Sequence, residues 1–288
     1  MLERAPIDFN TPVYNNEAFS DPKNHPKDLE ASERYNMPIS LASPVFLKPP
    51  KPGAGINTSI RKLLPLQKHY YQVLLRSLSE DAANYTPKRA RRAIEKAALS
   101  WIYVGLEDGL MSSFPGHTGF PQNFDPRERP WYTLAKGKRG PMWGAPHADI
   151  GGMGLTLSCA TSLYDARNRF LGVAGIDVTF DYIIEELLEI TDLAGVEGAE
   201  SFLLDKEGHI VVRSSKKGKK VSGSSGRELR MPKFMLPEVV QAVDALESSY
   251  VEVQRDGKKQ TAVYNRMHSL GWYFVVLGQP EELLAKFR

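Results

Sequence analysis

The sequence predicts an α+β protein in which helices come first and antiparallel strands follow. Between residues 57 and 97, apolar residues recur at intervals of three and four, which is the period of an amphipathic helix. After residue 98 the period changes to two, which is typical of strands with one buried face. A chain of 288 residues with 42% hydrophobic side chains can bury one or two cores of this kind.

Residues 1–55 are expected to form an extended, mostly irregular arm, because they contain nine of the twenty prolines. The arm still contains apolar side chains. Its segment "ISLASPVFL", residues 39–47, is expected to dock along the rest of the protein.

A helical stalk is predicted over residues 56–97. Its first part is one long helix that begins at Asn57 as N-cap and is kinked at Pro65. A second helix begins at Thr86 as N-cap, with Pro87 at the first helical position. We interpret the basic run in "KRARR" of this helix as a solvated face, with phosphate contact as the alternative.

Two sheet modules are predicted after the stalk, at residues 98–192 and 193–288. The first contains hairpins that turn at 107–109 and around 165–168, followed by the helix "FDYIIEELLEI". The second contains hairpins that turn at 206–208 and 256–257, the helix "KFMLPEVVQAVDAL" and the closing strand "GWYFVVLG". This second order of elements is that of a PAS-like fold. Its basic loop "SSKKGKKVSGSSG" is interpreted as a lid or a disordered tip.

Composition excludes several classes of protein. A net charge of +3 is too balanced for an obligatory nucleic-acid partner, although a pI near 8.8 is compatible with an anionic ligand. The single cysteine cannot form an internal disulfide, and no Cys/His cluster has zinc spacing, so we predict no metal and no cofactor. No segment has the length and apolarity of a membrane span, which is also what a region cut from between two spans would show.

Asp177 lies in "FLGVAGIDVTF", a strand that is apolar on both faces. A carboxylate there carries a desolvation cost of several kcal/mol unless a cation or hydrogen-bond donors meet it. We therefore expect a positive or donating group opposite Asp177. The alternative is a helix cap, since a helix is predicted to begin directly after this strand.

The stretch "WGAPHADIGGMG" places His147 and Asp149 two residues apart, so in an extended segment both side chains face the same way. A glycine-rich loop follows. It does not indicate a nucleotide site, because neither the preceding strand nor the Lys-Ser/Thr of a phosphate-binding loop is present.

Arg129 lies between two prolines that limit its conformation. Pro130 forces the preceding residue to be extended and suits the start of the short helix "PWYTLAKG", while Pro126 belongs to the turn before it. The Arg129 backbone is thus expected to be held stiffly.

The residues after Arg129 suggest what its guanidinium binds. Next to Trp131 and Tyr132, the planar, always-charged group can receive a carboxylate through two hydrogen bonds while the aromatic rings exclude water. The alternative is an ion pair with Asp125 or Glu128. Together with Asp149 and Asp177, the arginine favours a ligand that carries both a carboxylate and an ammonium group.

These motifs resemble the double Cache sensor family, the extracytoplasmic ligand-binding regions of bacterial chemoreceptors, histidine kinases, cyclases and Ser/Thr kinases. The segments that carry the likeness are "RERPWY", "PHAD" and "SLYDARNRFLGVAGIDVTF", and it is strongest over residues 99–180. Calcium-channel accessory subunits carry a similar region. The resemblance implies a long N-terminal helix packed on two stacked PAS-like modules, with the ligand in the module farther from the membrane.

In amino-acid-binding members of that family, an arginine and a tryptophan two residues later take the carboxylate, and two aspartates lie around the ammonium. The resemblance assigns these roles to Arg129, Trp131, Asp149 and Asp177. His147 stands where tyrosine is usual, which leaves the ligand class open, because a protonated imidazole would repel an ammonium group. Three aromatic residues complete the expected site: Tyr103, Tyr132 and Trp143.

The resulting prediction is the ectodomain of a membrane-tethered receptor, periplasmic or extracellular, that binds a small molecule such as an amino acid. "PEELLAKFR" is expected to be the last helix before a membrane span, and the long helix could mediate a homodimer. The alternatives are an interaction module without a ligand and, less favoured, an enzyme that uses His147, Asp149 and Asp177. No nucleophile or metalloprotease motif supports the enzyme.

Overall fold

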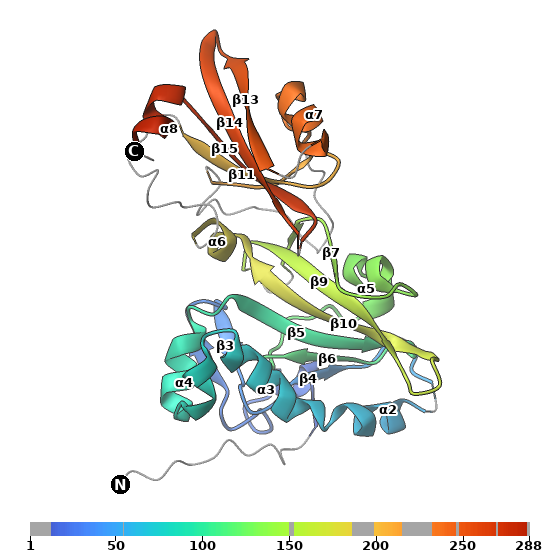
Figure 1. Cartoon of the computed structure of the whole chain (residues 1–288). Coiled ribbons are helices and arrows are strands. Elements are labelled where there is room, and N and C mark those ends of the chain that lie inside the picture. Colours follow the sequence, from blue (N-terminus) through green and yellow to red (C-terminus); the bar gives the residue numbers. More distant parts are fainter. Residues whose placement is uncertain are drawn as a thin grey trace. The chain divides into compact units, whose positions relative to one another are not determined.

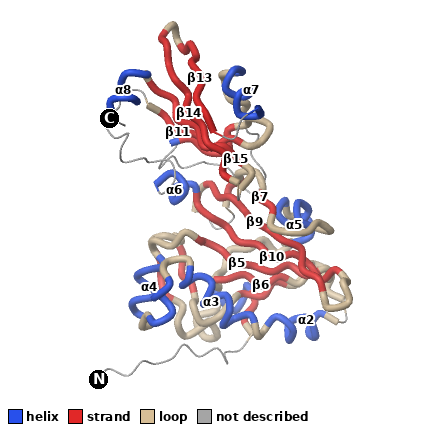
Figure 2. Tube along the Cα trace, viewed as in Figure 1, coloured by secondary structure: helices blue, strands red, loops and turns tan. Residues whose placement is uncertain are grey.

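The computed structural model describes residues 13–53, 55–149, 153–185, 199–214, 232–245, 248–268 and 270–286. They fall into two compact units that divide between Thr179 and Phe180. Each unit is built on its own sheet, which is antiparallel except for the parallel pair of β1 (Tyr14–Asn15) and β4 (Val45–Leu47) in the first unit (Figures 1 and 2).

The first unit is an eight-stranded sheet with β5 and β10 at its centre (Figure 1). The strand order is β1-β4-β6-β5-β10-β9-β7, and β8 also pairs with β9. The strands span β1 Tyr14–Asn15, β4 Val45–Leu47, β5 Leu99–Leu106, β6 Met111–Phe114, β7 Met142–Trp143, β8 His147–Ala148, β9 Leu155–Tyr164 and β10 Phe170–Thr179. The predicted hairpins are confirmed, with turn residues Gly109 and Asn168 at positive φ, as tight turns require.

The N-terminal arm is more ordered than its prolines indicate. Besides β1 and β4, the two outermost strands at one end of the large sheet, it forms α1 (Asn16–Ser20) and a small hairpin of β2 (Glu30–Ser32) and β3 (Met37–Ile39). Pro38 has no backbone N–H to donate to a neighbouring strand. It is tolerated here because the sheet of this hairpin has only two strands, both of them edge strands. Tyr35 is fully buried, and its hydroxyl donates a hydrogen bond of 2.7 Å to the Ser100 carbonyl oxygen. This contact holds the arm against the sheet.

The prediction of one long helix is wrong. The chain instead forms α2 (Ile56–Leu63), α3 (Leu66–Arg76) and α4 (Pro87–Ile94). Pro65 ends the first helix because it cannot donate a backbone hydrogen bond, and that helix begins at Ile56 after Gly55 rather than at Asn57. The Thr86 cap is confirmed, since its hydroxyl accepts from Arg89 N at 3.3 Å. A homodimer through these helices stays a prediction.

The helices cover one face of the first sheet (Figure 1). Tyr70 of α3 stacks on Phe114 of β6 with ring centroids 5.9 Å apart. On α4, Lys88, Arg89 and Arg92 of the basic run are exposed, whereas Arg91 forms ion pairs with Asp28 and Glu30 of the arm.

The second unit contains a five-stranded sheet in the order β12-β11-β15-β14-β13. Its elements are α6 Phe180–Ile183, β11 Glu200–Leu204, β12 Ile210–Arg213, α7 Pro237–Ala245, β13 Ser248–Arg255, β14 Lys258–Met267, β15 Trp272–Gly278 and α8 Pro280–Lys286. Phe202, Phe234 and Tyr264 lie in its core. Both predicted hairpins are present. Apart from Ser214, the basic loop of residues 214–226 lies outside the described residues, as does the end of the helix expected at 180–190.

None of the helices in the described parts of the chain is long and apolar enough to cross a membrane.

Candidate functional site

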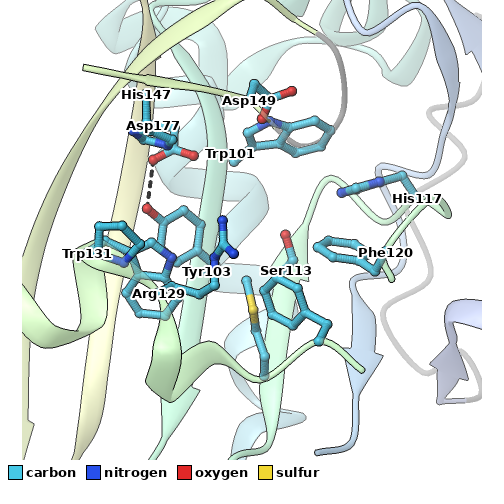
Figure 3. A pocket seen from close by; sticks show the side chains of 13 residues that line it. Trp101, Tyr103, Ser113, His117, Phe120, Arg129, Trp131, His147, Asp149 and Asp177 are labelled. Carbon is cyan, nitrogen blue, oxygen red and sulfur yellow. Dashed lines mark hydrogen bonds between the residues drawn. The ribbon is translucent and has the colours of Figure 1, made fainter. Parts of the chain in front are cut away.

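A pocket with a cavity volume of about 60 Å³ opens in the first unit. It combines aromatic walls with both signs of charge (Figure 3). The lining residues are Trp101, Tyr103, Met111, Ser113, His117, Phe120, Phe124, Arg129, Pro130, Trp131, His147, Asp149 and Asp177.

Strand register explains why these side chains meet. Asp177 of β10 pairs with Trp101 of β5, and two residues along, Gly175 pairs with Tyr103, which in turn pairs with Ser113 of β6. Paired residues, and those two apart, share a face of an antiparallel sheet. This face therefore forms one wall of the pocket, and the opposite face carries Phe114 and helix α3.

Asp177 is only 6% exposed and is met by hydroxyl donors. The Tyr103 and Ser158 hydroxyls both donate to its Oδ1, each at 2.6 Å. Burial raises the pKa of Asp177 to about 6, although these two hydrogen bonds oppose the rise. The expectation of donating groups opposite Asp177 is confirmed. The helix-cap alternative is wrong, because the side chain lies inside β10 and faces the pocket.

Asp149 is the second buried carboxylate. Its Oδ1 accepts from the Trp101 indole at 2.9 Å and its Oδ2 from Met153 N at 3.1 Å. Burial raises the pKa of Asp149 to about 6, and the nearby charge of Asp177 adds to the effect, while both hydrogen bonds oppose it. His147, on β8, lines the same pocket, with Nε2 3.2 Å from Thr156 Oγ1. The two side chains thus share a wall, as their spacing predicts.

Arg129 contributes the positive group. It is extended, with φ −85° and ψ 145°, between the 3₁₀ turn η2 (Pro126–Glu128) and α5 (Pro130–Ala135). Its guanidinium carbon lies 5.7 Å from the centre of the Phe124 ring, and burial lowers the pKa of Arg129 from its usual value. Asp125 does not compete for it in the structure, because that carboxylate forms an ion pair with Arg127 at 2.6 Å.

Trp131 lies against Tyr103, with ring centroids 4.6 Å apart. Two glycines make this possible. A Cβ at Gly105 would meet the Trp131 ring at 2.9 Å, and one at Gly175 would overlap the Tyr103 ring. The glycines let two large rings lie flat along the strands and bring the Tyr103 hydroxyl to Asp177.

Two of the eight expected site residues lie outside the pocket lining. Tyr132 follows Trp131 in helix α5, where consecutive side chains diverge by about 100°, and it packs instead beside Phe170 at 6.3 Å. Trp143 pairs with Cys159, which pairs with Ile176, so the strand register puts it on the sheet face opposite Asp177. Neither residue therefore joins the other six in the pocket lining.

The remaining seven lining residues are additional to the sequence prediction. Trp101, Met111 and Ser113 could be found by extending the alternation of Tyr103 across the predicted hairpin. Pro130 lies between two predicted residues. His117, Phe120 and Phe124 belong to a connection without periodicity, so the sequence carries no comparable signal for them.

One group in the second unit could hold a metal ion. Asp205, Glu207 and His209 offer ligand atoms within 4.8 Å of one another. The Asp205 carboxylate already accepts from Glu207 N at 2.9 Å and from His209 N at 2.8 Å, which closes the turn between β11 and β12. These contacts account for the group as part of a hairpin.

A family model described as "Cache domain" matches residues 60–287, more than half of the chain. The chain belongs to the Cache family. Among its curated relatives, methyl-accepting chemotaxis protein McpG of Pseudomonas putida is 25% identical over 224 residues, and McpA of the same organism is 33% identical over 117 residues. The match to McpG covers 77% of this Cache chain and 32% of McpG. The match to McpA covers 40% of this chain and 17% of McpA.

Solved Cache structures resemble the chain at low identity. The ligand-binding domain of the Pseudomonas fluorescens chemoreceptor CtaA, in complex with L-leucine, matches with a TM-score of 0.47 and 20% identity, covering 81% of this chain and 91% of that domain. The domain of the Pseudomonas aeruginosa amino-acid chemoreceptor PctB, in complex with L-Arg, matches with a TM-score of 0.48 and 20% identity, covering 80% and 90%.

Proposed function

We propose that this chain is the extracytoplasmic sensor region of a membrane signalling receptor, and that its first unit binds an amino acid or a related zwitterion. Its curated relatives include chemotaxis receptors, and its family supplies their sensor regions. Since the chain spans a third or less of those receptors, the membrane tether and the output of the full protein are part of the proposal.

The observation that carries the proposal is that Arg129 and two buried aspartates line one pocket. Arg129 presents a planar fork that suits a carboxylate, next to the apolar ring of Trp131. Asp177 and Asp149 have pKa values raised to about 6 by burial, so both are stabilised by a cation that replaces lost water. An α-amino acid carries both charged groups on one carbon atom.

His147 determines which ammonium groups are accepted. A neutral imidazole can accept a hydrogen bond from the ligand, whereas a protonated one would repel it. Primary amines with a carboxylate on the same carbon are therefore the first class to test.

The second unit is proposed to relay the signal rather than to bind ligand. Its sequence, residues 199–288, contains neither an Arg-x-Trp pair nor an aspartate within an apolar strand comparable to Asp177. Chemical-shift changes on residues 202–212 upon ligand addition, with none around Asp177, would show that the ligand binds the second unit and would contradict this proposal.

A melting-temperature screen against amino acids, amines and carboxylates tests the function. A ligand present at about a hundred times its Kd adds about 2.7 kcal/mol to the free energy of unfolding. We expect zwitterions to raise the melting temperature more than the matched amine or carboxylate alone. An interaction module without a ligand predicts no shift with any compound, and an enzyme predicts turnover of the compound that binds. We expect no turnover.

A further inference from the structure

The pocket has a second end, away from Asp177 and Trp131, that contains His117 and Phe120 (Figure 3). His117 is 3% exposed and lies between two aromatic rings. Its ring centre is 4.3 Å from Trp101 and 4.5 Å from Phe120. This packing holds the imidazole in one orientation at the edge of the cavity.

The hydrogen bond of His117 determines its tautomer. Nδ1 lies 2.6 Å from the Thr118 carbonyl oxygen. A carbonyl oxygen can only accept, so Nδ1 carries the proton and Nε2 presents a lone pair. Burial lowers the pKa of His117 to about 4, which keeps the ring neutral near pH 7. Among the described residues, no hydrogen bond reaches Nε2, which makes it an acceptor available to a ligand donor.

The N-terminal arm holds this end of the pocket in place. Ser40 and Gly116 exchange backbone hydrogen bonds of 2.9 and 3.0 Å, directly before His117. The Asn16 amide donates to the Phe120 carbonyl at 3.2 Å and accepts from Phe120 N at 3.4 Å. The family match begins at residue 60, so a segment outside the match positions His117 and Phe120. These contacts fix where His117 and Phe120 lie at this end of the pocket.

We propose that His117, Trp101 and Phe120 form a side-chain subsite that selects amino acids whose side chain is planar and carries N–H donors, an amide or a guanidinium group. His117 Nε2 accepts from the donor, and the aromatic rings pack on the planar group. An apolar side chain of the same length leaves the buried acceptor without a partner and is disfavoured. This inference rests on the proposed binding of an amino acid at the other end of the pocket.

The test compares L-glutamine with L-methionine, which is of similar length but has no side-chain donor, by calorimetric titration of the whole chain. We expect glutamine to bind about five to a hundred times more tightly, the range for leaving one buried group unsatisfied. In His117→Phe, which keeps a ring between Trp101 and Phe120, the ratio of the two Kd values should fall to about one. The control, His69→Phe, changes an exposed histidine on α3 and should keep the wild-type ratio.

L-arginine distinguishes the two planar groups. Tighter binding of arginine than of glutamine identifies guanidinium as the preferred group, and the reverse order identifies the amide. Either result supports the subsite, provided that His117→Phe removes the advantage over methionine.

A measurement on the wild-type protein covers the case in which His117→Phe does not fold. The ¹⁵N resonance of His117 Nε2 should shift when glutamine is added and stay in place with methionine, because only glutamine donates a hydrogen bond to it. Equal affinities for glutamine and methionine, with no Nε2 shift, would overturn the subsite while leaving amino-acid binding intact. Failure of every amino acid to bind would overturn the proposed function and the subsite together.

Discussion

Replacing Asp177 by asparagine should stabilise the ligand-free protein at neutral pH. Tyr103 and Ser158 both donate to the same oxygen, Oδ1, and an asparagine carbonyl oxygen in that place can accept both hydrogen bonds. The substitution therefore removes a buried charge while keeping its donors satisfied.

The size of the effect follows from the raised pKa of Asp177. An unfolded aspartate titrates near 3.8 and the folded one near 6, so between these values the folded state binds more protons than the unfolded state. The contribution of Asp177 to the free energy of unfolding therefore falls as the pH rises from about 4 to about 6. At about 1.4 kcal/mol per pH unit, the loss is about 3 kcal/mol above pH 7. Asp177→Asn does not titrate and should not show this loss.

Urea unfolding of both proteins from pH 4 to pH 7.5 measures the difference. Tryptophan fluorescence suits the first unit, which contains three of the four tryptophans. The advantage of Asp177→Asn should grow by about 3 kcal/mol across this range, or about 6 to 12 °C in melting temperature for a unit of this size. A constant difference between the two proteins at all pH values would show that Asp177 titrates normally and would refute the reasoning.

Three further predictions concern ligand binding. Affinity for an amino acid should fall about tenfold per pH unit below about pH 6, because protonated Asp177 no longer attracts the ammonium group; calorimetry with a pH-independent affinity would contradict this. Arg129→Lys and Asp177→Asn should each weaken binding by about thirtyfold to several thousandfold, the range for breaking a desolvated ion pair; an unchanged Kd in either variant would remove that residue from the site. Gly175→Ala should displace the Tyr103 ring and weaken binding at least about tenfold, whereas Gly257→Ala, where nothing lies within 4 Å of the added carbon, should bind normally and lose only stability.

Local features of the sequence were sufficient for the order of strands and turns. The change of period after residue 98 indicated strands, an apolar run marked β10, and Gly109 and Asn168 marked the turns of the two hairpins, because period and turn chemistry act over a few neighbouring residues. The same local reasoning misjudged the helices. It treated Pro65 as a kink, and the chain uses it as a break between α2 and α3.

For the site, the sequence by itself determined the residues whose chemistry is unusual for their position. A carboxylate in an apolar strand, Asp177, and an arginine held by Pro130 are visible without a structure, since burial and backbone restriction leave a local signal. Only the tertiary structure decided the rest. Strand register put Trp143 on the sheet face opposite Asp177, and contacts with the N-terminal arm, such as the one between Asn16 and Phe120, hold the segment that brings His117 and Phe120 into the pocket. No local pattern encodes contacts of that range.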